Sequence, residues 1–130
     1  MSTDKLKVMV LDDEPIVCKR VQPALEKLGY EVESYTNSHE AMRRIQETEY
    51  DIIVTDLKMK GIDGMQFLQE AKKRSPRTEV IVITGFATLE TAKESFHKGV
   101  FDFIAKPFKL SEIQDVVNKA AAKLRGTAGR

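Results

Sequence analysis

Short apolar runs alternate with amphipathic helical patterns along the chain, and this alternation constrains the fold more than any other feature of the sequence. The runs at 51–56 and 79–85 are apolar almost throughout, which is typical of strands buried on both faces of a sheet. Strands that alternate with helices through short links form a parallel sheet covered on both faces, with right-handed crossovers. We therefore predict an α/β domain with strands at 7–11, 31–35, 51–56, 79–85 and 101–105 and helices at 14–28, 38–47, 65–74, 88–98 and 110–124.

Residues at the predicted helix ends support these boundaries. Ser38, Thr88 and Ser111 are suited to be N-caps, because a serine or threonine hydroxyl accepts a hydrogen bond from a free backbone N–H of the first turn. Gly29 is suited to end the first helix. Pro23 lies inside that helix and removes a backbone donor, so we expect a kink there.

Composition and charge narrow the class of protein. The chain has 130 residues, 42% of them hydrophobic, which suffices for one globular domain with a core. A net charge of +1 gives no broad attraction to nucleic acid or to an anionic membrane, and no apolar run approaches the roughly 20 residues needed to cross a bilayer. Cys18, the single cysteine, excludes an internal disulfide and fits a reducing compartment. We expect a cytoplasmic protein with one domain at 1–125 and a flexible tail at 126–130.

Carboxylates follow two of the predicted strands. Asp12 and Asp13 come directly after the run "VMVL", and Asp56 ends "DIIVTD". Ligands of an open parallel sheet bind beyond the carboxyl ends of the strands, where the strand order reverses, so these three groups converge if the first and third strands are neighbours. Two unit charges about 4 Å apart repel by roughly 4 kcal/mol at an effective dielectric constant of about 20, so the cluster needs a positive charge.

Two sources of positive charge are available to this cluster. Lys106 ends the fifth predicted strand, and a divalent ion can bind among the oxygens. The ligands are hard oxygens without a cysteine or histidine nearby, which favours Mg²⁺, Mn²⁺ or Ca²⁺ over Zn²⁺. Thr84 ends the fourth strand and can hydrogen-bond a phosphoryl oxygen. The pattern thus predicts phosphoryl chemistry, with Asp56 as nucleophile and with Thr84 and Lys106 stabilising the transferred group.

The ordered set of motifs resembles the receiver domains of response regulators in bacterial two-component signalling. The matching segments are "LDDEP", "VTDLKMKGIDGM", "VIVITGFA" and "FDFIAKPF", and the resemblance covers about residues 5–124. It implies a doubly wound, flavodoxin-like (βα)5 fold with a five-stranded parallel sheet in the order 2-1-3-4-5. The segment "ITGFATLETA" is also similar to receivers attached to transcriptional activators of the AAA+ type.

The resemblance implies a role for each carboxylate. Asp56 is the implied phosphoacceptor, and Asp12, Asp13, Asp56 and the backbone carbonyl of Lys58 are the implied ligands of Mg²⁺. One residue departs from the family pattern, because Lys60 stands where receivers usually have proline. This departure bears on the stiffness of the loop after Asp56 and not on its chemistry.

The resemblance also implies how the phosphorylated state is sensed. Thr84 and Lys106 are expected to contact the phosphoryl group. Phe103 is either the switch aromatic, which changes rotamer when Thr84 moves, or a plain core residue, and the sequence does not separate the two. Lys58 and Phe86 occupy positions at which receivers set the lifetime of the phosphorylated state.

Other residues near these motifs have structural interpretations. We predict a cis peptide bond between Lys106 and Pro107, because the lysine has to turn back over the site and proline lowers the cost of the cis form to about 0.5–1 kcal/mol. Asp51 opens its strand at the wrong end, Asp63 belongs to a turn flanked by glycines, and Asp102 precedes the apolar part of its strand. We interpret these three carboxylates as structural.

These roles predict a phosphorylation switch and not a turnover enzyme. The expected partner is a sensor histidine kinase or a phosphotransfer protein, and a phosphorylation-dependent homodimer through 88–98, 101–105 and 110–124 is a further option. We expect no direct binding of nucleic acid or membrane by this domain. The output is expected in transcription, with a stand-alone receiver of the phosphorelay or motility type as the alternative.

Two other classes of protein share this fold. A flavin-binding protein is disfavoured, because the carboxylates of "DDEP" would repel the phosphate of the cofactor. A Mg²⁺-dependent phosphohydrolase with an aspartyl nucleophile typically has a second aspartate two residues after the first, and here that residue is Lys58.

Overall fold

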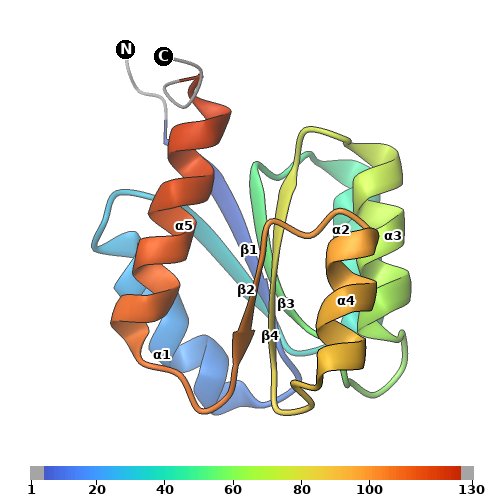
Figure 1. Ribbon diagram of the computed structural model, residues 1–130. Coiled ribbons are helices and arrows are strands. Elements are labelled where there is room, and N and C mark those ends of the chain that lie inside the picture. The colour runs from blue at the N-terminus through green and yellow to red at the C-terminus, as the bar shows by residue number, and fades with distance from the viewer. Residues whose placement is uncertain (1–4, 127–130) are drawn as a thin grey trace.

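The computed structural model describes residues 5–126 and shows a parallel sheet between two layers of helices (Figure 1). The strands are β1 (Lys7–Leu11), β2 (Glu31–Tyr35), β3 (Ile52–Asp56), β4 (Glu79–Thr84) and β5 (Asp102–Ala105). The helices are α1 (Pro15–Glu26), α2 (Ser38–Glu47), α3 (Gly64–Arg74), α4 (Leu89–His97) and α5 (Leu110–Leu124). The strand order is β2-β1-β3-β4-β5 with parallel pairing throughout, which confirms the predicted (βα)5 fold.

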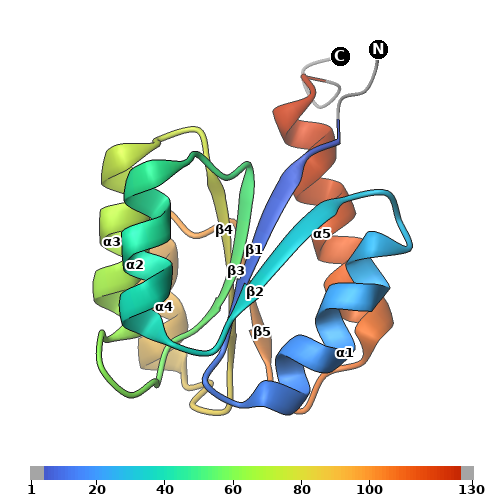
Figure 2. The same ribbon diagram turned by 180° about the vertical axis from the view of Figure 1, so that it is seen from behind.

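The two helical layers contain different numbers of helices. Helices α1 and α5 cover one face of the sheet, and α2, α3 and α4 cover the other (Figures 1 and 2). Among residues 5–126, no helix is long and apolar enough to cross a membrane. The tail predicted at 126–130 lies outside the described residues except for Gly126, and the domain boundary at residue 125 stays a prediction.

Alternate residues of the central strands enter different cores, as their continuous apolar character predicted. Val8 and Val10 of β1 pack with buried residues of α1 and α5, whereas Met9 and Leu11 pack with α2 and α3. Burying an aliphatic side chain of this size contributes roughly 1.5–3 kcal/mol. Packing on both faces therefore fixes the position of β1 and of the residues that follow it.

Helix α1 differs slightly from its predicted extent. It runs through Pro23 and ends at Glu26, two residues before the predicted end at Leu28. Gly29 then adopts a φ of 97°, a left-handed conformation that is unfavourable for residues with a Cβ atom. This turn directs the chain into β2.

The N-cap of α2 is Asn37 and not Ser38, which corrects the sequence prediction. The side chain of Asn37 accepts a hydrogen bond from the backbone N–H of Glu40 at 3.0 Å. Ser38 is the first helical residue, and its buried hydroxyl contacts the loop after β3. The hydroxyl is therefore used for a tertiary contact.

Of the two remaining predicted N-caps, Thr88 is confirmed and Ser111 is wrong. Thr88 caps α4 as predicted, because its hydroxyl accepts from the N–H of Thr91 at 3.0 Å. Ser111 does not cap α5, because it lies inside the first turn. The helix begins after Lys109, whose backbone N–H donates to Glu112 Oε1 at 2.8 Å.

All five strands end at the same edge of the sheet, which is the lower edge in Figure 1. At this edge Asp56 pairs with Ile83 across β3 and β4, and Thr84 pairs with Ala105 across β4 and β5. The start of β1 and the end of α5 lie together at the opposite edge in both ribbon views.

Candidate functional site

Lys106 lies at the centre of a group of carboxylates at the carboxyl edge of the sheet. Its Nζ atom is 2.8 Å from Asp12 Oδ2, 3.0 Å from Asp56 Oδ2 and 2.7 Å from Glu14 Oε1. Asp12 and Asp56 are buried, whereas Glu14 is exposed. The contacts with Asp12 and Asp56 join the ends of β1, β3 and β5, as the sequence predicted, but the contact with Glu14 was not predicted.

The charges in this group influence one another. Burial raises the pKa of Asp12, although Lys106 opposes that shift. Burial of Lys106 favours its neutral form, but its contacts with the carboxylates of Asp12, Glu14 and Asp56 outweigh this effect and raise the pKa of the ammonium group. The site therefore keeps a protonated lysine among the carboxylates at neutral pH.

Backbone N–H groups hold the carboxylates in place. Asp12 Oδ1 accepts from the N–H of Glu14 at 2.9 Å. Asp56 Oδ1 accepts from the N–H of Leu57 at 2.6 Å and of Lys58 at 3.3 Å. These bonds leave Asp56 Oδ2 directed at the Lys106 ammonium, so the carboxylate presents one oxygen to the site.

The residues present fit a hard divalent cation. Asp12, Asp13 and Asp56 each offer one carboxylate oxygen, and these oxygens lie within 4.8 Å of one another. Asp12 Oδ2 is buried and accepts no hydrogen bond, so its one partner among the described residues is the ion pair with Lys106. Carboxylate and carbonyl oxygens are the ligands that Mg²⁺ and Ca²⁺ prefer.

The loop after β3 packs tightly against the start of α3 at Gly64. A Cβ atom at this position would lie 2.3 Å from the carbonyl oxygen of Asp56 and 2.5 Å from Leu57 Cα. The N–H of Gly64 donates to the carbonyl of Leu57 at 3.0 Å. Glycine is therefore required for the backbone that follows Asp56, and the sequence indicated only a turn here.

Lys58 and Phe86 meet across the mouth of the site. Lys58 Nζ lies 5.6 Å from the centroid of the Phe86 ring, within the range of a cation–π contact, and Phe86 is 57% exposed. The backbone N–H of Phe86 donates to Thr84 Oγ1 at 3.0 Å. The two residues predicted to set the lifetime thus contact each other, and one of them is bonded to the predicted switch threonine.

Phe103 is half-buried at the margin of a small core. It packs with the buried residues Leu57, Val82 and Val100. This places its ring in the same cluster as the residue that follows Asp56. The peptide bond between Lys106 and Pro107 is cis, the isomer predicted from the sequence.

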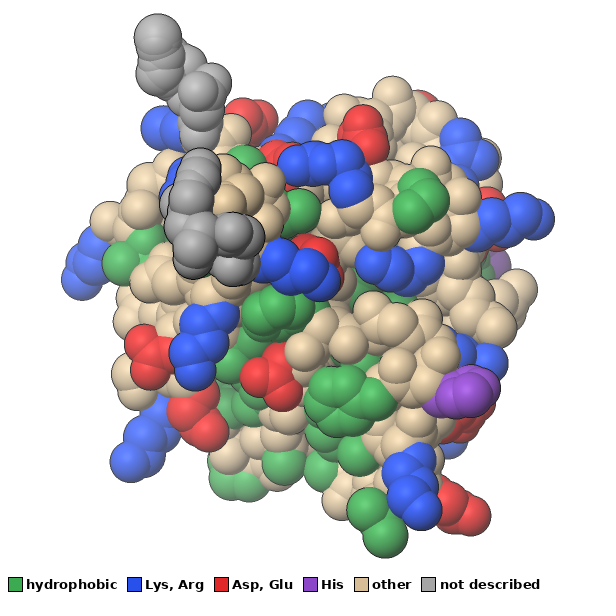
Figure 3. Space-filling view, turned by 45° about the horizontal axis from the view of Figure 1, so that its top comes forward, with side chains coloured by type: hydrophobic (Ala, Val, Ile, Leu, Met, Phe, Trp, Pro, Cys, Tyr) green, Lys and Arg blue, Asp and Glu red, His purple; other side chains and the backbone are tan. Residues whose placement is uncertain are grey.

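The surface between α4 and α5 has an apolar centre. Figure 3 shows hydrophobic side chains gathered over β5 on this face. Leu89 and Phe96 of α4 are exposed by 74% and 50%, and Phe101, directly before β5, is half-buried. This surface includes the segments predicted for a phosphorylation-dependent homodimer.

The carboxylates that were predicted to be structural make contacts outside the acidic group. Asp51 Oδ2 accepts from the N–H of Lys7 at 2.8 Å, and its Oδ1 pairs with Arg77 at 2.9 Å. Asp63 caps α3 by accepting from the N–H of Met65 at 3.0 Å. These contacts agree with their structural interpretation.

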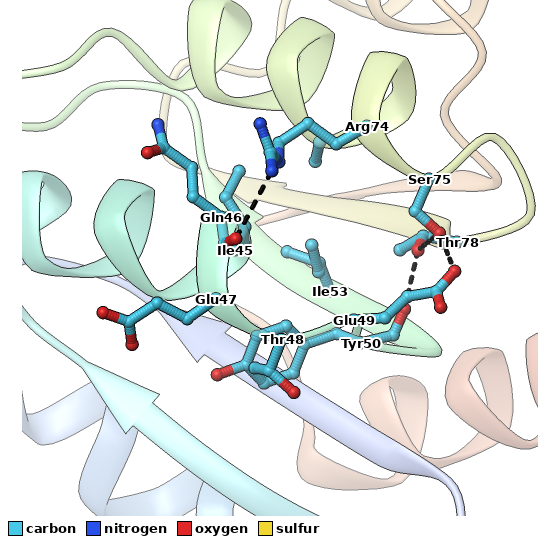
Figure 4. A pocket seen from close by; sticks show the side chains of 11 residues that line it. Ile45, Gln46, Glu47, Thr48, Glu49, Tyr50, Ile53, Arg74, Ser75 and Thr78 are labelled. Carbon is cyan, nitrogen blue, oxygen red and sulfur yellow. Dashed lines mark hydrogen bonds between the residues drawn. The ribbon is translucent and has the colours of Figure 1, made fainter.

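A hollow of about 270 Å³ lies at the opposite end of the sheet, between the α2–β3 connection and α3 (Figure 4). Its polar groups bond one another: Ser75 donates to Glu49 at 2.6 Å, and Thr78 donates to the carbonyl of Tyr50 at 2.6 Å. None of the predicted site residues lines it. The acidic group at the carboxyl edge is therefore the candidate site.

Comparison with known proteins identifies the family. The family model "Response regulator receiver domain" matches residues 8–118. The chain is 31% identical to "Transcriptional regulatory protein ZraR" of Salmonella typhimurium over 98% of its own length and 29% of that protein. It is 32% identical to "Regulatory protein AtoC" of Escherichia coli over 88% of its length and 25% of that protein. The chain thus spans less than a third of these curated relatives.

A solved structure agrees with this match. The response regulator receiver domain of Clostridium thermocellum is 31% identical and superimposes with a TM-score of 0.85, over 92% of this chain and 97% of that one. The match covers all four of the residues that form the acidic group with its lysine, namely Asp12, Asp13, Asp56 and Lys106. The chain belongs to the response regulator receiver domain family, the phosphorylation switches of two-component systems, which are not turnover enzymes.

Proposed function

We propose that Asp56 is the phosphoacceptor of this receiver. The observation that carries the proposal is the orientation of its carboxylate, with Oδ1 held by two backbone N–H groups and Oδ2 facing Lys106 at 3.0 Å. A carboxylate oxygen attacks the phosphorus of a phosphohistidine, a P–O bond forms and the P–N bond breaks. The imidazole leaves with the electron pair and takes up a proton.

The chain's own residues stabilise the transferred group. The Lys106 ammonium already contacts Asp56 and can move one donor to a phosphoryl oxygen. The Thr84 hydroxyl accepts from Phe86 and remains able to donate its own proton to the same group. When bound, a divalent ion, with Mg²⁺ the expected one, neutralises charge on the phosphoryl oxygens. Asp12, Asp13, Asp56 and the carbonyl of Lys58 would hold it.

We propose that the signal leaves through Thr84 and Phe103. A phosphoryl group adds about −1.5 to −2 charge and strong acceptor oxygens, which attract the Thr84 hydroxyl. Movement of Thr84 at the end of β4 changes the space beside Phe103, and packed interiors favour discrete arrangements of a ring. The apolar surface over α4, β5 and α5 would then change its affinity for a partner or for a second copy.

The proposed phosphodonor is a sensor histidine kinase or a phosphotransfer protein in the cytoplasm. The proposed output is transcriptional control, which is supported by the names of the relatives. A stand-alone receiver that acts on another protein is the alternative. Coexpression with candidate kinases, followed by a comparison of phosphotransfer rates, would identify the donor.

The phosphoacceptor assignment is tested by intact mass after incubation with Mg²⁺ and acetyl phosphate. Wild type should gain one phosphoryl mass, and Asp56→Asn should gain none at a comparable rate. Asp51→Asn is the matched control, because this carboxylate lies at the opposite edge of the sheet and bonds Lys7 and Arg77. Wild-type labelling of Asp56→Asn would disprove the assignment.

A further inference from the structure

The backbone of Lys60 contacts a carboxylate of the acidic group. Its N–H donates to Asp13 Oδ2 at 3.1 Å, across 47 positions of sequence. The Lys60 side chain is exposed. Asp13 is less buried than Asp12 and Asp56. The hydrogen bond from Lys60 therefore restrains the least buried of the three carboxylates.

Ser38 holds this part of the loop from the other side. Its hydroxyl is buried, donates to the carbonyl of Lys60 at 2.8 Å and accepts from the N–H of Ile62 at 2.8 Å. The carbonyl of Lys60 thus accepts from Ser38, and its N–H donates to Asp13. The loop and the start of α2 lie at the same end of the molecule as the end of β1 (Figure 2).

Gly61 allows the close approach between the loop and α2. It adopts a φ of 85°, and a Cβ atom there would lie 2.7 Å from Ser38 Oγ and 2.9 Å from His39 Nε2. A larger residue would require the side chain of Ser38 or His39 to shift, in a backbone conformation that favours glycine. Residues 60–62 are consequently pinned by contacts that the sequence prediction did not include.

We propose that the Lys60 amide and the Ser38 hydroxyl are positioning groups that orient Asp13 for the metal ion. The inference rests on the proposed metal site. A carboxylate has about four lone-pair positions, so one bond from Lys60 leaves others free for a cation. Hydrogen bonds of this kind orient ligating carboxylates and strengthen metal binding. Proline at position 60 would lack the donor, because it has no N–H.

The amide is tested by titrating Mg²⁺ into unphosphorylated protein in a calorimeter. Lys60→Pro and Lys60→Ala remove the same charge, but only the alanine variant keeps the N–H. The dissociation constant of Lys60→Pro should exceed that of Lys60→Ala by about 10-fold, as for other partners of metal ligands. Equal constants in the two folded variants would overturn the role of the amide.

The hydroxyl is tested by Ser38→Ala, with Ser95→Ala as the matched control. Ser95 is also buried, and its hydroxyl bonds Thr91 within α4. Ser38→Ala should raise the Mg²⁺ concentration needed for half-maximal phosphorylation and leave the rate at saturating Mg²⁺ unchanged. A lower saturating rate with an unchanged Mg²⁺ dissociation constant would show a general structural role and overturn the proposal.

Asp13→Asn separates this inference from the proposed function. If wild type binds Mg²⁺ and Asp13→Asn binds it more weakly, the metal site is correct and the Lys60 and Ser38 variants decide the inference. If Asp13→Asn binds as tightly as wild type, the metal assignment of Asp13 fails and the inference fails with it.

Discussion

Lys106 Nζ lies closer to Glu14 Oε1, at 2.7 Å, than to the carboxylate of either Asp12 or Asp56. The Lys106 ammonium hydrogen-bonds Glu14 and Asp56 and forms an ion pair with Asp12. Lys106 lowers the pKa of Glu14, so Glu14 is ionised at neutral pH. A phosphoryl oxygen would compete with these carboxylates for the ammonium group, and Glu14 is the exposed member of the three.

Glu14→Gln should accelerate phosphorylation by acetyl phosphate. The change weakens the competing ion pair and removes a negative charge that repels the anionic donor. An exposed ion pair is weak, so we expect an increase of about 2- to 5-fold. Rates are compared on gels that separate the phosphorylated form, with Glu26→Gln, exposed at the end of α1, as control. An equal or slower rate in Glu14→Gln would contradict competition for the lysine.

Phe86→Ala should shorten the lifetime of the phosphorylated state. Phe86 and Lys58 meet across the mouth of the site, so the ring hinders the in-line approach of water to the phosphorus. Loss of the phosphoryl group is followed by intact mass after removal of the donor. Phe96→Ala is the control, because this phenylalanine is also exposed but belongs to α4. An unchanged or longer lifetime in Phe86→Ala would count against a steric role.

Phe103→Ala should accept a phosphoryl group at Asp56, but its affinity for a partner or a second copy should change less on phosphorylation. If the ring is the switch, phosphorylation changes the dimer or partner affinity of the variant by a smaller factor than in wild type. Sedimentation with and without acetyl phosphate measures the dimer, after thermal unfolding has confirmed that the variant folds. An affinity gain equal to that of wild type would show that Phe103 is a core residue.

Glu33→Gln should destabilise the fold at neutral pH and not in acid. Burial disfavours the charged form of Glu33 and tends to raise its pKa. Hydrogen bonds from Tyr50 at 2.5 Å, Arg44 at 3.1 Å and Tyr35 at 3.1 Å outweigh this effect, so the pKa of Glu33 is lowered. A lowered pKa contributes stability above the unfolded value of 4.5, and this stability is lost as the pH falls through the folded value. We expect a loss on the order of 1 kcal/mol at pH 7, or about 3–5 °C in melting temperature.

Thermal unfolding at pH 7 and at low pH measures this difference. Glu31→Gln is the matched control, because Glu31 lies on the same strand and is exposed. A loss in Glu33→Gln that is equally large in acid would show that the side chain stabilises the fold by packing and not by charge.

The strand order came from the family resemblance, whereas the acidic group could be predicted from the sequence for a simple physical reason. Buried parallel strands have continuous apolar runs, and polar residues that follow such runs meet at one edge of the sheet. Once the first and third strands are neighbours, Asp12 and Asp56 therefore converge wherever the exact strand boundaries fall, and Lys106 follows a strand that ends at the same edge. Their positions depend on topology and not on rotamers.

The contacts of Glu14, Ser38 and Gly64 were not predictable in this way. Serine before a helical pattern favours an N-cap, but Asn37 takes that role and leaves the Ser38 hydroxyl for a loop distant in sequence. The ion pair of Glu14 depends on the length and rotamers of two side chains. The close approach at Gly64 depends on how one loop packs against a helix, and a local pattern does not contain that distance.

The distance of the end of α5 from the acidic group limits the electrostatic effect that a phosphoryl group can have there. Helix α5 has 15 residues, so its end lies about 22 Å from its beginning at the carboxyl edge of the sheet. The electrostatic field between exposed charges is screened over about 8 Å at physiological ionic strength. A domain joined after α5 would therefore sense the new charge only through shifts in the packing of the helix, and added salt should leave that response largely intact.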